Sequence, residues 1–533
     1  MKKILSLLFV IPALWATVAV AQSREMTPVR KLQYAEQIIE NFYVDTPDTT
    51  KLVEDAIVAM LKDLDPHSTY TNAEETRELT EPLEGGFSGI GIRFQVLNDT
   101  LSVIEAVSGG PSEQAGIMAG DKIIACNDTV IAGVKKKNSQ IMKILRGPRG
   151  TVANLKVVRK NTPEPIDFRI VREDIPIYSV DAAFMIDKNT GYIRIARFAE
   201  STTREVEDAM KSLKKNGMKN LIIDLTDNGG GYLRPSYEIS NMFLRKGDKL
   251  VYTESPRAGR HDYVAETDGT FLDGKVVLMV NQFSASASEI LSGAMQDNDR
   301  AAIVGRRTFG KGLVQRPFPF PDGSMMRLTV SRYYTPSGRC IQKPYADGDD
   351  DNYRHDMDNR LASGEFMSAD SIHLNDSLCY YTLRNRRPVY GGGGIMPDRF
   401  VAIDTTFYTT YYRDLVAKGI VNRFCFDYVD DNRAALKKKY KNADKFIEGF
   451  TVSEDMMQDL IEFGEKEGVE YNAGQYAVSG GYLTTVVKAL IGRDLYDQAT
   501  YFRIANSLNP IYRAALDLIN SDDEYGRLLS GKK

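Results

Sequence analysis

The chain has 533 residues, of which 43% are hydrophobic and 26% are charged. This composition excludes a disordered tail protein or a collagen-like fibre, and the length leaves room for about three domains of ~150 residues. Asp and Glu number 72 against 68 Lys and Arg, a net charge of −4. The chain therefore has no broad basic surface, and we expect no nucleic-acid partner.

The first residues are typical of a secretory signal. Met1-Lys2-Lys3 precedes an apolar run, and Ala19-Val20-Ala21 supplies an A-x-A cleavage site, which predicts a signal peptide over residues 1–21. No cysteine lies at this junction to carry a lipid anchor, and no other segment has the ~20 apolar residues that span a bilayer. We expect an exported protein with no stable membrane span.

The pattern along the chain predicts four regions after the signal. Helical periodicity within residues 22–83 indicates a small N-terminal helical region. Residues 84–172 contain short β-rich runs broken by glycine and predict a compact β-rich module. Residues 173–400 alternate strand and helix, as in an α/β core. Residues 401–533 are helical again, with Ser453 as a predicted N-cap and no evident chemistry.

Within the α/β core, the elements can be placed individually. The pattern predicts strands over 192–198, 221–225 and 276–280, and helices over 203–213 and from near Ala287. An aspartate-rich insertion, 345–377, interrupts this core. Its Gly348 stands second rather than sixth in the run, so the calcium-loop pattern fails and a solvated loop is expected. We expect no metal.

The four cysteines are too few for a disulfide scaffold in a chain of this length. An oxidising compartment still permits one or two bridges, and Cys340 with Cys379 is the pair to test. The other two are Cys126 and Cys425.

The sharpest local feature is the run from strand 276–280 into Asn281–Glu289. A serine at a strand-to-helix junction can expose its hydroxyl beside backbone N–H groups that stabilise an oxyanion. Ser286 through Glu289 also spell a capping box, which is the structural alternative.

A serine nucleophile needs a base. The four histidines after the signal, His67, His261, His355 and His373, stand in no recognisable hydrolase signature. Lysine is the other option, and Lys311 lies between two glycines in an apolar segment. It accepts a proton only when neutral, so burial would have to lower its pKa from ~10.4 by roughly three units. A solvated surface charge is the alternative.

Two further features could complete a site. Gln315 could hydrogen-bond the Lys311 amine and orient it, provided that the chain turns enough. The glycine-rich turn Asp224–Gly231 follows a buried-looking strand and could aim backbone N–H groups at an anion. It lacks the Lys-Ser/Thr ending of a phosphate loop, and an ordinary flexible turn is the alternative.

Taken together, Ser284–Glu289 followed by Gly310-Lys311-Gly312 and Gln315 resembles the C-terminal processing proteases, also called tail-specific serine proteases. The likeness extends over roughly residues 30 to 400 and includes further similar segments at Leu64–Ser68, Pro111–Asp121, Tyr334–Arg339 and Gly394–Asp398. It implies an α/β multidomain fold: an α/β serine-protease core with an inserted β-rich PDZ domain, flanked by N-terminal and C-terminal helical regions.

The resemblance also implies roles for individual residues. Ser286 would be the nucleophile, Lys311 the general base and Gln315 the residue that orients the lysine, with Ser284 and Ser288 structural. The oxyanion hole would be the N–H groups of Ala287 and Gly231, with Gly230 as the fallback because the triple glycine leaves the register open. No metal or organic cofactor is implied.

The β-rich module resembles a PDZ domain. Gly89-Ile90-Gly91-Ile92 is similar to the carboxylate-binding loop, so the N–H groups of Ile90, Gly91 and Ile92 would capture a peptide C-terminus while the peptide adds to the sheet edge. A tight turn in any β domain is the alternative. Arg146 is a candidate for coupling peptide occupancy to the active site, and a salt-bridged surface arginine is the other reading.

These expectations combine into one function: an exported serine endopeptidase of the bacterial periplasm. It would recognise protein C-termini through its PDZ domain and cleave nearby peptide bonds of envelope proteins by a Ser–Lys mechanism. The alternatives are a catalytically silent PDZ scaffold that binds C-terminal peptides, and an ester or amide hydrolase that uses His261. The C-terminal helical region could support a homo-oligomer or bind an adaptor.

Overall fold

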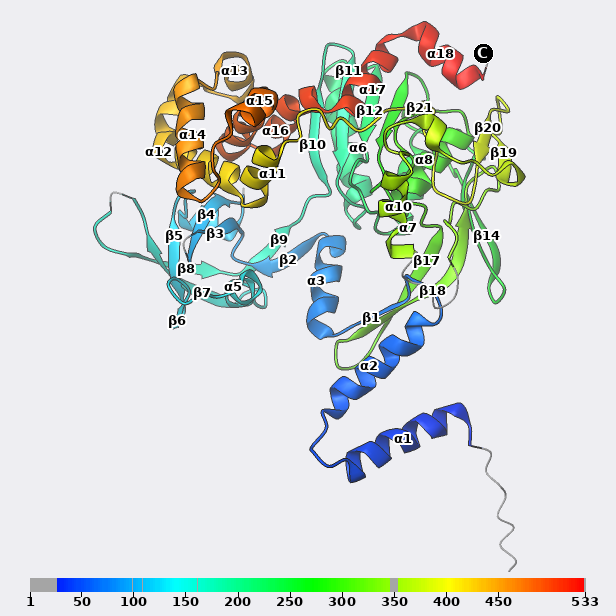
Figure 1. Ribbon diagram of the computed structural model, residues 1–533, viewed down its shortest axis with the longest axis horizontal. Coiled ribbons are helices and arrows are strands. Elements are labelled where there is room, and N and C mark those ends of the chain that lie inside the picture. Colours follow the sequence, from blue (N-terminus) through cyan, green and yellow to red (C-terminus); the bar gives the residue numbers. More distant parts are fainter. Residues whose placement is uncertain (1–25, 98, 108, 161, 346–352, 532–533) are drawn as a thin grey trace, which may run out of the picture. The chain divides into compact units, whose positions relative to one another are not determined.

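The computed structural model describes residues 26–97, 99–107, 109–160, 162–345 and 353–531, and the chain forms two compact units that divide after Asp63 (Figure 1). The first unit holds α1 (Pro28–Phe42) and α2 (Thr49–Lys62), which lie where the sequence predicts helical structure. The predicted signal peptide lies outside the described residues. Over the described ranges, no helix is both long and apolar enough to cross a membrane.

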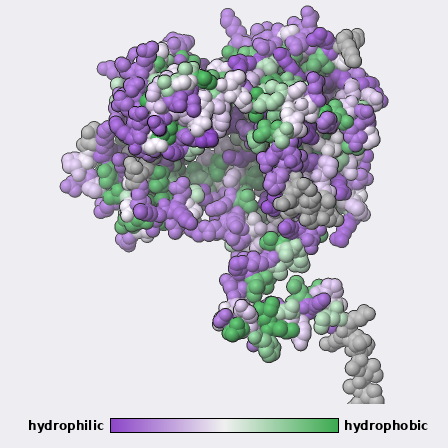
Figure 2. All heavy atoms as spheres, viewed as in Figure 1, coloured by the Kyte–Doolittle hydropathy of each residue, from purple (hydrophilic) through white to green (hydrophobic). Residues whose placement is uncertain are grey.

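Helices α1 and α2 begin where side chains can satisfy their first N–H groups. The Thr27 hydroxyl accepts from Arg30 N, and the Asp48 carboxylate accepts from Lys51 N. Both helices are amphipathic, and their exposed apolar side chains appear green in Figure 2.

The second unit is built on a six-stranded sheet of order β10-β11-β12-β15-β16-β21. Strands β11 to β21 run parallel, and β10 joins one edge antiparallel to β11. The strands are β10 (Val180–Met185), β11 (Thr190–Ile195), β12 (Asn220–Asp224), β15 (Val276–Val280), β16 (Ala302–Gly305) and β21 (Arg399–Phe400). All five residues of β15 are buried, as expected for a central parallel strand covered on both faces.

Helices cover both faces of this sheet. Alternate strand residues such as Ile223 and Leu278 pack against α6 (Thr202–Lys215), α7 (Leu233–Asn241) and α8 (Ala287–Asp297). Their neighbours Ile222 and Val277 pack on the other side against α17 (Pro510–Asn520) and α18 (Asp522–Ser530). Because successive side chains of a strand point to opposite faces of the sheet, each face packs against its own layer of helices. The result is a three-layer α/β/α core, which confirms the predicted fold class.

A second sheet extends from this core, with order β1-β18-β13-β14 and β17 also paired to β18. Its strands are β1 (Thr69–Thr71), β13 (Lys249–Ser255), β14 (Gly259–Val264), β17 (Leu313–Pro319) and β18 (Met325–Tyr334). Lys311 lies immediately before β17. Because β1 pairs with β18, this sheet also brings the segment Leu64–Ser68 toward the lysine loop.

The β-rich module is inserted through a short antiparallel pair, β2 (Gly86–Gly89) and β9 (Glu173–Pro176), that follows helix α3 (Ala73–Glu84). Its own sheet has order β3-β4-β5-β7-β8, with β3 at one edge and β6 paired to β5. The elements are β3 (Ile92–Leu97), β4 (Thr100–Ala106), α4 (Pro111–Ala115), β5 (Lys122–Cys126), β6 (Thr129–Val130), α5 (Asn138–Leu145), β7 (Val152–Val158) and β8 (Ile166–Val171). The module has its own apolar core.

The C-terminal helices form two groups. The first packs around a separate apolar core and comprises α11 (Thr410–Ala417), α12 (Ile420–Lys439), α13 (Ala443–Gly449), α14 (Glu454–Lys466), α15 (Ala473–Leu495) and α16 (Gln498–Ala505). Ser453 caps α14, as predicted. The second group, α17 and α18, returns to the main sheet (Figure 1). The region expected over 401–533 therefore divides, because its last helices bury the second face of the α/β core.

The prediction of a solvated loop over 345–377 was wrong for its described part. This segment contains α10 (Asp356–Ala362), followed by β19 (Cys379–Tyr381) and β20 (Pro388–Tyr390). Tyr353, Arg360 and Glu365 are buried. The Arg360 guanidinium donates to the backbone oxygens of Arg307 (2.7 Å) and Thr308 (3.2 Å), so the insertion packs against the loop that leads to Lys311. The many aspartates of the segment indicated a solvated loop, although its Tyr353 and Arg360 are buried.

All four cysteines are free thiols in this structure. Cys126 and Cys425 are buried, whereas Cys340 and Cys379 are only partly buried. The bridge between Cys340 and Cys379 stays a prediction for the oxidised protein.

Candidate active site

Ser286 occupies the junction between β15 and α8 that the sequence singled out. Its backbone has φ of 56° and ψ of −114°, a conformation that costs roughly 1–3 kcal/mol for a residue with a side chain. The flanking serines are completely buried, and their hydroxyls donate to backbone oxygens, Ser284 to Leu225 (2.7 Å) and Ser288 to Asn228 (2.9 Å). Ser286 is the partly exposed serine of the three.

A single carboxylate links Ser286 to Lys311. Oε2 of Glu289 accepts from the backbone N–H of Ser286 (2.8 Å) and from that of Lys311 (2.9 Å). Both backbone nitrogens therefore lie within hydrogen-bond distance of one oxygen atom. The structure thus brings together the predicted nucleophile and the predicted base, which are 25 residues apart in the sequence.

Lys311 is partly buried, and this lowers the pKa of its amine to about 8. Burial is the main cause, and the positive charge of Arg327 on β18 acts in the same direction. The carboxylates of Glu289 and Asp65 oppose the shift. A lysine with a pKa near 8 has a substantial neutral fraction close to neutral pH, as a general base requires.

Asp65 and His67 complete the surroundings of the lysine. The Asp65 carboxylate accepts from the N–H groups of His67 (2.8 Å) and Ser68 (2.9 Å) and from the Thr329 hydroxyl (3.0 Å). Burial and the charge of Lys311 lower the pKa of His67 to about 3, so its ring is neutral near pH 7. Nε2 of that ring lies 2.7 Å from the Tyr353 hydroxyl.

Gln315 lies on β17, next to a register irregularity in its pairing with β18. Its side-chain N–H donates to the Thr329 hydroxyl (3.2 Å), which itself donates to Asp65. Both residues are described in the structure, and no hydrogen bond joins the Gln315 side chain to the Lys311 amine. The role of Gln315 as the residue that orients the lysine stays a prediction.

The glycine-rich turn lies against the nucleophile. Gly230 has φ of 101°, and a Cβ on it would lie 2.7 Å from Ser286 Cβ, closer than packed atoms allow. The Gly230 N–H donates to Oδ1 of Asn228 (2.8 Å) and so is already used. Gly231 is exposed, and within the described chain its N–H has no protein acceptor, which favours it over Gly230 as an oxyanion donor.

The first turn of α8 offers a second donor. The Ser286 N–H is occupied by Glu289, whereas the N–H of Ala287 has no acceptor among the described residues. Because it belongs to the positive end of the helix, it is suited to a developing negative charge. The contacts therefore leave Ala287 and Gly231 available, the pair that the resemblance implies.

The β-rich module carries a groove of about 320 Å³ between β3 and α5. Ile90, Gly91 and Ile92 line one end of it, and Met142, Leu145 and Arg146 contribute from α5 and its C-terminus. Strand β3 is an edge strand, and the N–H groups of Ile90 and Gly91 lack protein acceptors in the described structure. This groove can accept an extended peptide alongside β3.

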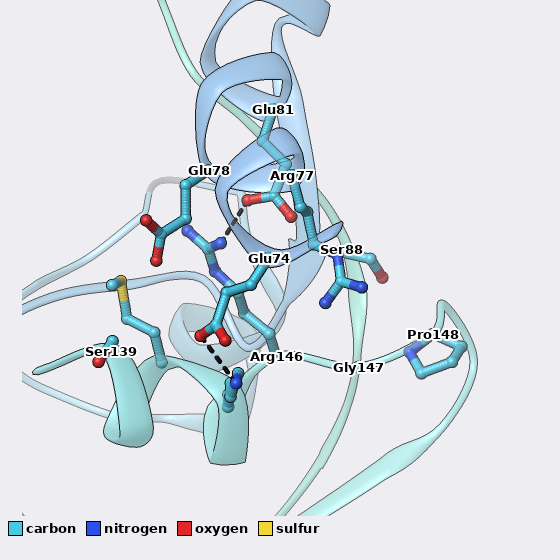
Figure 3. Close-up of a pocket in the computed structure, with 11 residues that line it drawn as sticks. Glu74, Arg77, Glu78, Glu81, Ser88, Ser139, Arg146, Gly147 and Pro148 are labelled. Carbon is cyan, nitrogen blue, oxygen red and sulfur yellow. Dashed lines mark hydrogen bonds and ion pairs between the residues drawn. The ribbon is translucent and has the colours of Figure 1, made fainter. Parts of the chain in front are cut away.

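Arg146 connects this groove to helix α3. Its guanidinium forms an ion pair with Glu81 and lies 4.4 Å from the centre of the Phe87 ring. A second pair, Lys143 with Glu74 (2.7 Å), joins the same two helices around a pocket of about 430 Å³ (Figure 3). In the sequence, Asp65 is followed by β1 and then by α3. Helix α3 therefore connects the peptide groove, through Arg146, to the segment that surrounds Lys311.

Sequence reasoning missed three parts of this site. Glu289 was assigned only a helix-capping role. Tyr333 of β18, whose hydroxyl donates to the backbone oxygen of Lys311, was not considered. Asp65 was noted within Leu64–Ser68 but received no function. The capping-box spacing of Glu289 was a usable signal, since it places a carboxylate beside the Ser286 N–H. His261, the base in one alternative, is exposed on the edge strand β14.

Over the described ranges, no group of three or more His, Cys, Asp or Glu side chains is arranged to hold a metal ion. The arrangement around Ser286 and Lys311 is instead suited to nucleophilic acyl transfer by a serine with a lysine base.

Four protein-family profiles match parts of the chain. The profile of peptidase family S41 matches residues 189–350, and a PDZ domain profile matches residues 88–170. The profile of the activating protease CtpB N-terminal domain matches residues 15–76. A family of unknown function, DUF8443, matches residues 411–497 in the C-terminal helices.

Similar curated proteins are bacterial proteases. The carboxy-terminal-processing protease of Bartonella bacilliformis is 35% identical over 308 residues, which cover 56% of this chain and 69% of that protein. A probable CtpA-like serine protease of Staphylococcus epidermidis is 35% identical over 59% of this chain and 63% of its own length. The carboxy-terminal processing protease CtpA of Bacillus subtilis is 34% identical over 59% of this chain and 66% of its own length. The last two are thus matched over slightly less than two thirds of their length.

The fold and the site define an α/β peptidase core with an inserted peptide-binding module. The chain belongs to the carboxy-terminal-processing proteases of peptidase family S41 and carries a PDZ domain.

Proposed function

We propose that the protein is a serine endopeptidase that recognises protein C-termini through its PDZ domain and cleaves peptide bonds by a Ser–Lys mechanism. The observation that carries this proposal is the shared contact of the Ser286 and Lys311 backbones with one oxygen of Glu289. The lowered pKa of Lys311 and the positive φ of Ser286 support the roles of base and nucleophile.

The proposed reaction starts with neutral Lys311, which takes the proton from the Ser286 hydroxyl as Oγ attacks the carbonyl carbon of the substrate. The resulting oxyanion receives hydrogen bonds from the N–H groups of Gly231 and Ala287. The Lys311 ammonium then protonates the leaving amine, and the C–N bond breaks. Lys311 next removes a proton from water as the water oxygen attacks the carbonyl carbon of the acyl ester. The C–Oγ bond then breaks, and Lys311 returns the proton to Oγ of Ser286, which restores the serine hydroxyl and the neutral lysine. Gln315 orients the lysine, and no cofactor takes part.

The PDZ groove supplies substrate selection in this proposal. A peptide would pair with the edge strand β3 and place its C-terminal carboxylate on the N–H groups of Ile90, Gly91 and Ile92. The unused N–H groups of Ile90 and Gly91 within the described structure support this placement. Arg146 would report occupancy to the protease core, because it lines the groove and also pairs with Glu81 of α3.

We also propose the compartment and the substrate class. The sequence of residues 1–21 supports export, and the bacterial relatives support a place in the cell envelope, the periplasm, where the substrates would be envelope proteins with accessible C-termini.

The test is intact-mass analysis of a loosely folded protein with an apolar C-terminus, incubated with the wild type, Ser286→Ala and Lys311→Ala. A second substrate carries an amidated C-terminus. Fragments from the wild type alone, reduced by amidation, are the expected result.

Fragments from all three proteins would place the chemistry elsewhere. Binding of the substrate without any fragments would favour the PDZ scaffold, and loss of activity in His261→Ala but not in Lys311→Ala would favour the histidine hydrolase.

A further inference from the structure

Glu289 is completely buried, and four donors surround its carboxylate. Oε2 accepts from the N–H groups of Ser286 and Lys311, as described above. Oε1 accepts from the Thr308 hydroxyl (2.5 Å) and from the Gly310 N–H (2.7 Å). Three of the four donors belong to the loop that carries Lys311, and the fourth is the nucleophile itself.

Tyr333 of β18 contacts the same two backbones from the carbonyl side. Its hydroxyl lies 3.2 Å from the backbone oxygen of Ser286 and also donates to the backbone oxygen of Lys311. The side chain is 1% exposed. Ser286 and Lys311 are thus each contacted at N–H by Glu289 and at C=O by Tyr333.

These contacts address two problems that the proposed mechanism poses. The nucleophile and the base lie on different elements, so something must fix their separation. Ser286 also has a positive φ, which would relax if the surrounding structure did not hold it. Glu289 and Tyr333 address both problems because they contact the backbone N–H and C=O groups of Ser286 and Lys311.

We propose that Glu289 and Tyr333 are positioning residues that set the distance between the Ser286 hydroxyl and the Lys311 amine. The inference rests on the proposed function, because it assigns the two side chains to the same reaction. Neither acts on substrate directly, and their effect passes through the backbones of Ser286 and Lys311.

The chemistry of the pocket requires a carboxylate at residue 289. All four partners are donors, and only an ionised carboxylate can accept from all of them. In Glu289→Gln one oxygen is replaced by an NH2 group, which is a donor and cannot accept from a backbone N–H on its side. The variant keeps the size of the side chain but loses either the acceptor of the Ser286 and Lys311 N–H groups or the acceptor of the Gly310 N–H.

The experiment measures kcat and KM of Glu289→Gln with a peptide substrate. A misplacement of about 1 Å at reacting groups can cost about 100-fold in rate, so we expect kcat to fall about 100-fold with KM within about twofold. The matched control is Asp299→Asn, another buried carboxylate, which accepts from Arg387 Nε (2.7 Å) and Asn385 N (2.7 Å) without contacting Ser286 or Lys311. It should match the wild type in kcat.

The pH dependence of kcat/KM distinguishes a positioning role from a loss of stability, because a loss of stability alone does not shift this profile. The charged or titratable groups facing the Lys311 amine are Glu289 on α8, Arg327 on β18, and Asp65 and His67 before β1. Burial raises the pKa of Glu289 to about 7, so its carboxylate is ionised above that pH and there raises the pKa of Lys311. Its replacement by Gln should therefore move the acidic limb of kcat/KM to lower pH. Asp299→Asn should leave this limb in place.

Several outcomes would overturn the inference: a folded Glu289→Gln with kcat within threefold of the wild type, an equal loss in Asp299→Asn, or a loss confined to KM. If Glu289→Gln does not fold, Tyr333→Phe takes its place, with kcat reduced at least tenfold and KM unchanged as the expected result, and unchanged kcat as the contrary one. Full activity of Ser286→Ala or Lys311→Ala would instead refute the proposed function.

Discussion

Arg339 and Asp297 form an ion pair in which neither side chain is exposed, with 2.7 Å between Nη2 and Oδ1. Asp297 is the last residue of α8, the helix that begins after Ser286. Arg339 belongs to the segment Tyr334–Arg339, which begins at the last residue of β18. The pair therefore joins the far end of the nucleophile helix to the strand that carries Tyr333.

Arg339→Met should destabilise this part of the core strongly. Removal of one partner of a buried ion pair leaves an uncompensated charge, and such changes cost roughly 3–5 kcal/mol. Hydrogen–deuterium exchange of peptides from α8 measures the loss as faster local opening. Arg234→Met is the control, because Arg234 pairs with Glu238 on the surface of α7 (3.2 Å) and such pairs contribute at most about 1 kcal/mol. Equal exchange rates in the two variants would contradict this prediction.

The activity should depend on pH through Lys311. The base works only when neutral, so kcat/KM should fall about tenfold per pH unit below the pKa of about 8 and level off above it. His67 does not produce this limb, because its pKa of about 3 leaves it neutral throughout the range. A pH series with one peptide substrate checks this, and a limb near pH 6 would argue for a different base.

Two substitutions near Lys311 should move that limb in opposite directions. The charge of Arg327 lowers the pKa of Lys311, so Arg327→Gln should move the limb to higher pH. The carboxylate of Asp65 raises this pKa, so Asp65→Asn should move the limb to lower pH. Shifts of the same sign in both variants would mean that general loosening, rather than charge, governs the profile.

Gly230→Ala should abolish most activity. Its Cβ would lie 2.7 Å from Ser286 Cβ, and the positive φ disfavours any side chain at this position. We expect at least a 100-fold loss of kcat, since the nucleophile must shift by a substantial fraction of an ångström. Gly229→Ala is a matched control one residue away, because its Cβ would have no neighbour within 4 Å. Similar losses in the two variants would show that the turn, rather than the contact, is sensitive.

Glu81→Gln should separate peptide binding from activation. Glu81 pairs with Arg146 but does not line the peptide groove, so peptide affinity, measured by fluorescence polarisation, should stay within about twofold. If the pair carries the coupling, stimulation of cleavage by a C-terminal peptide should fall at least about fivefold. Glu74→Gln, which removes the neighbouring pair with Lys143, is the control. Unchanged stimulation in Glu81→Gln would leave Arg146 as a surface ion-pair residue.

Much of the fold could be predicted from the sequence because its patterns are local. The apolar run at 276–280 coincides with β15. The helix predicted from near Ala287 is α8. The covering of the main sheet by α17 and α18 could not be predicted, since a helix amphipathic in sequence does not indicate which distant surface it will bury.

The candidate site was predicted in part for the same reason. Ser286, Lys311 and the glycine turn belong to motifs of a few residues each, and the structure brings them together. Glu289 and Tyr333 act through contacts with backbone groups, some of them far away in sequence, which leave no pattern in the side-chain order. The contact of Gln315 with Thr329 likewise depends on the pairing of β17 with β18.

The position of α17 and α18 has a consequence for how the protein is made. Tyr525 of α18 exchanges hydrogen bonds with the backbone of Val276 (3.0 Å), the first residue of the strand that leads to Ser286. Residues 1–525 must therefore be synthesised before this strand gains this partner. Since chains are synthesised from the N-terminus, the nucleophile is made before the layer that supports it, and the second face of the sheet stays uncovered until α17 and α18 have been added.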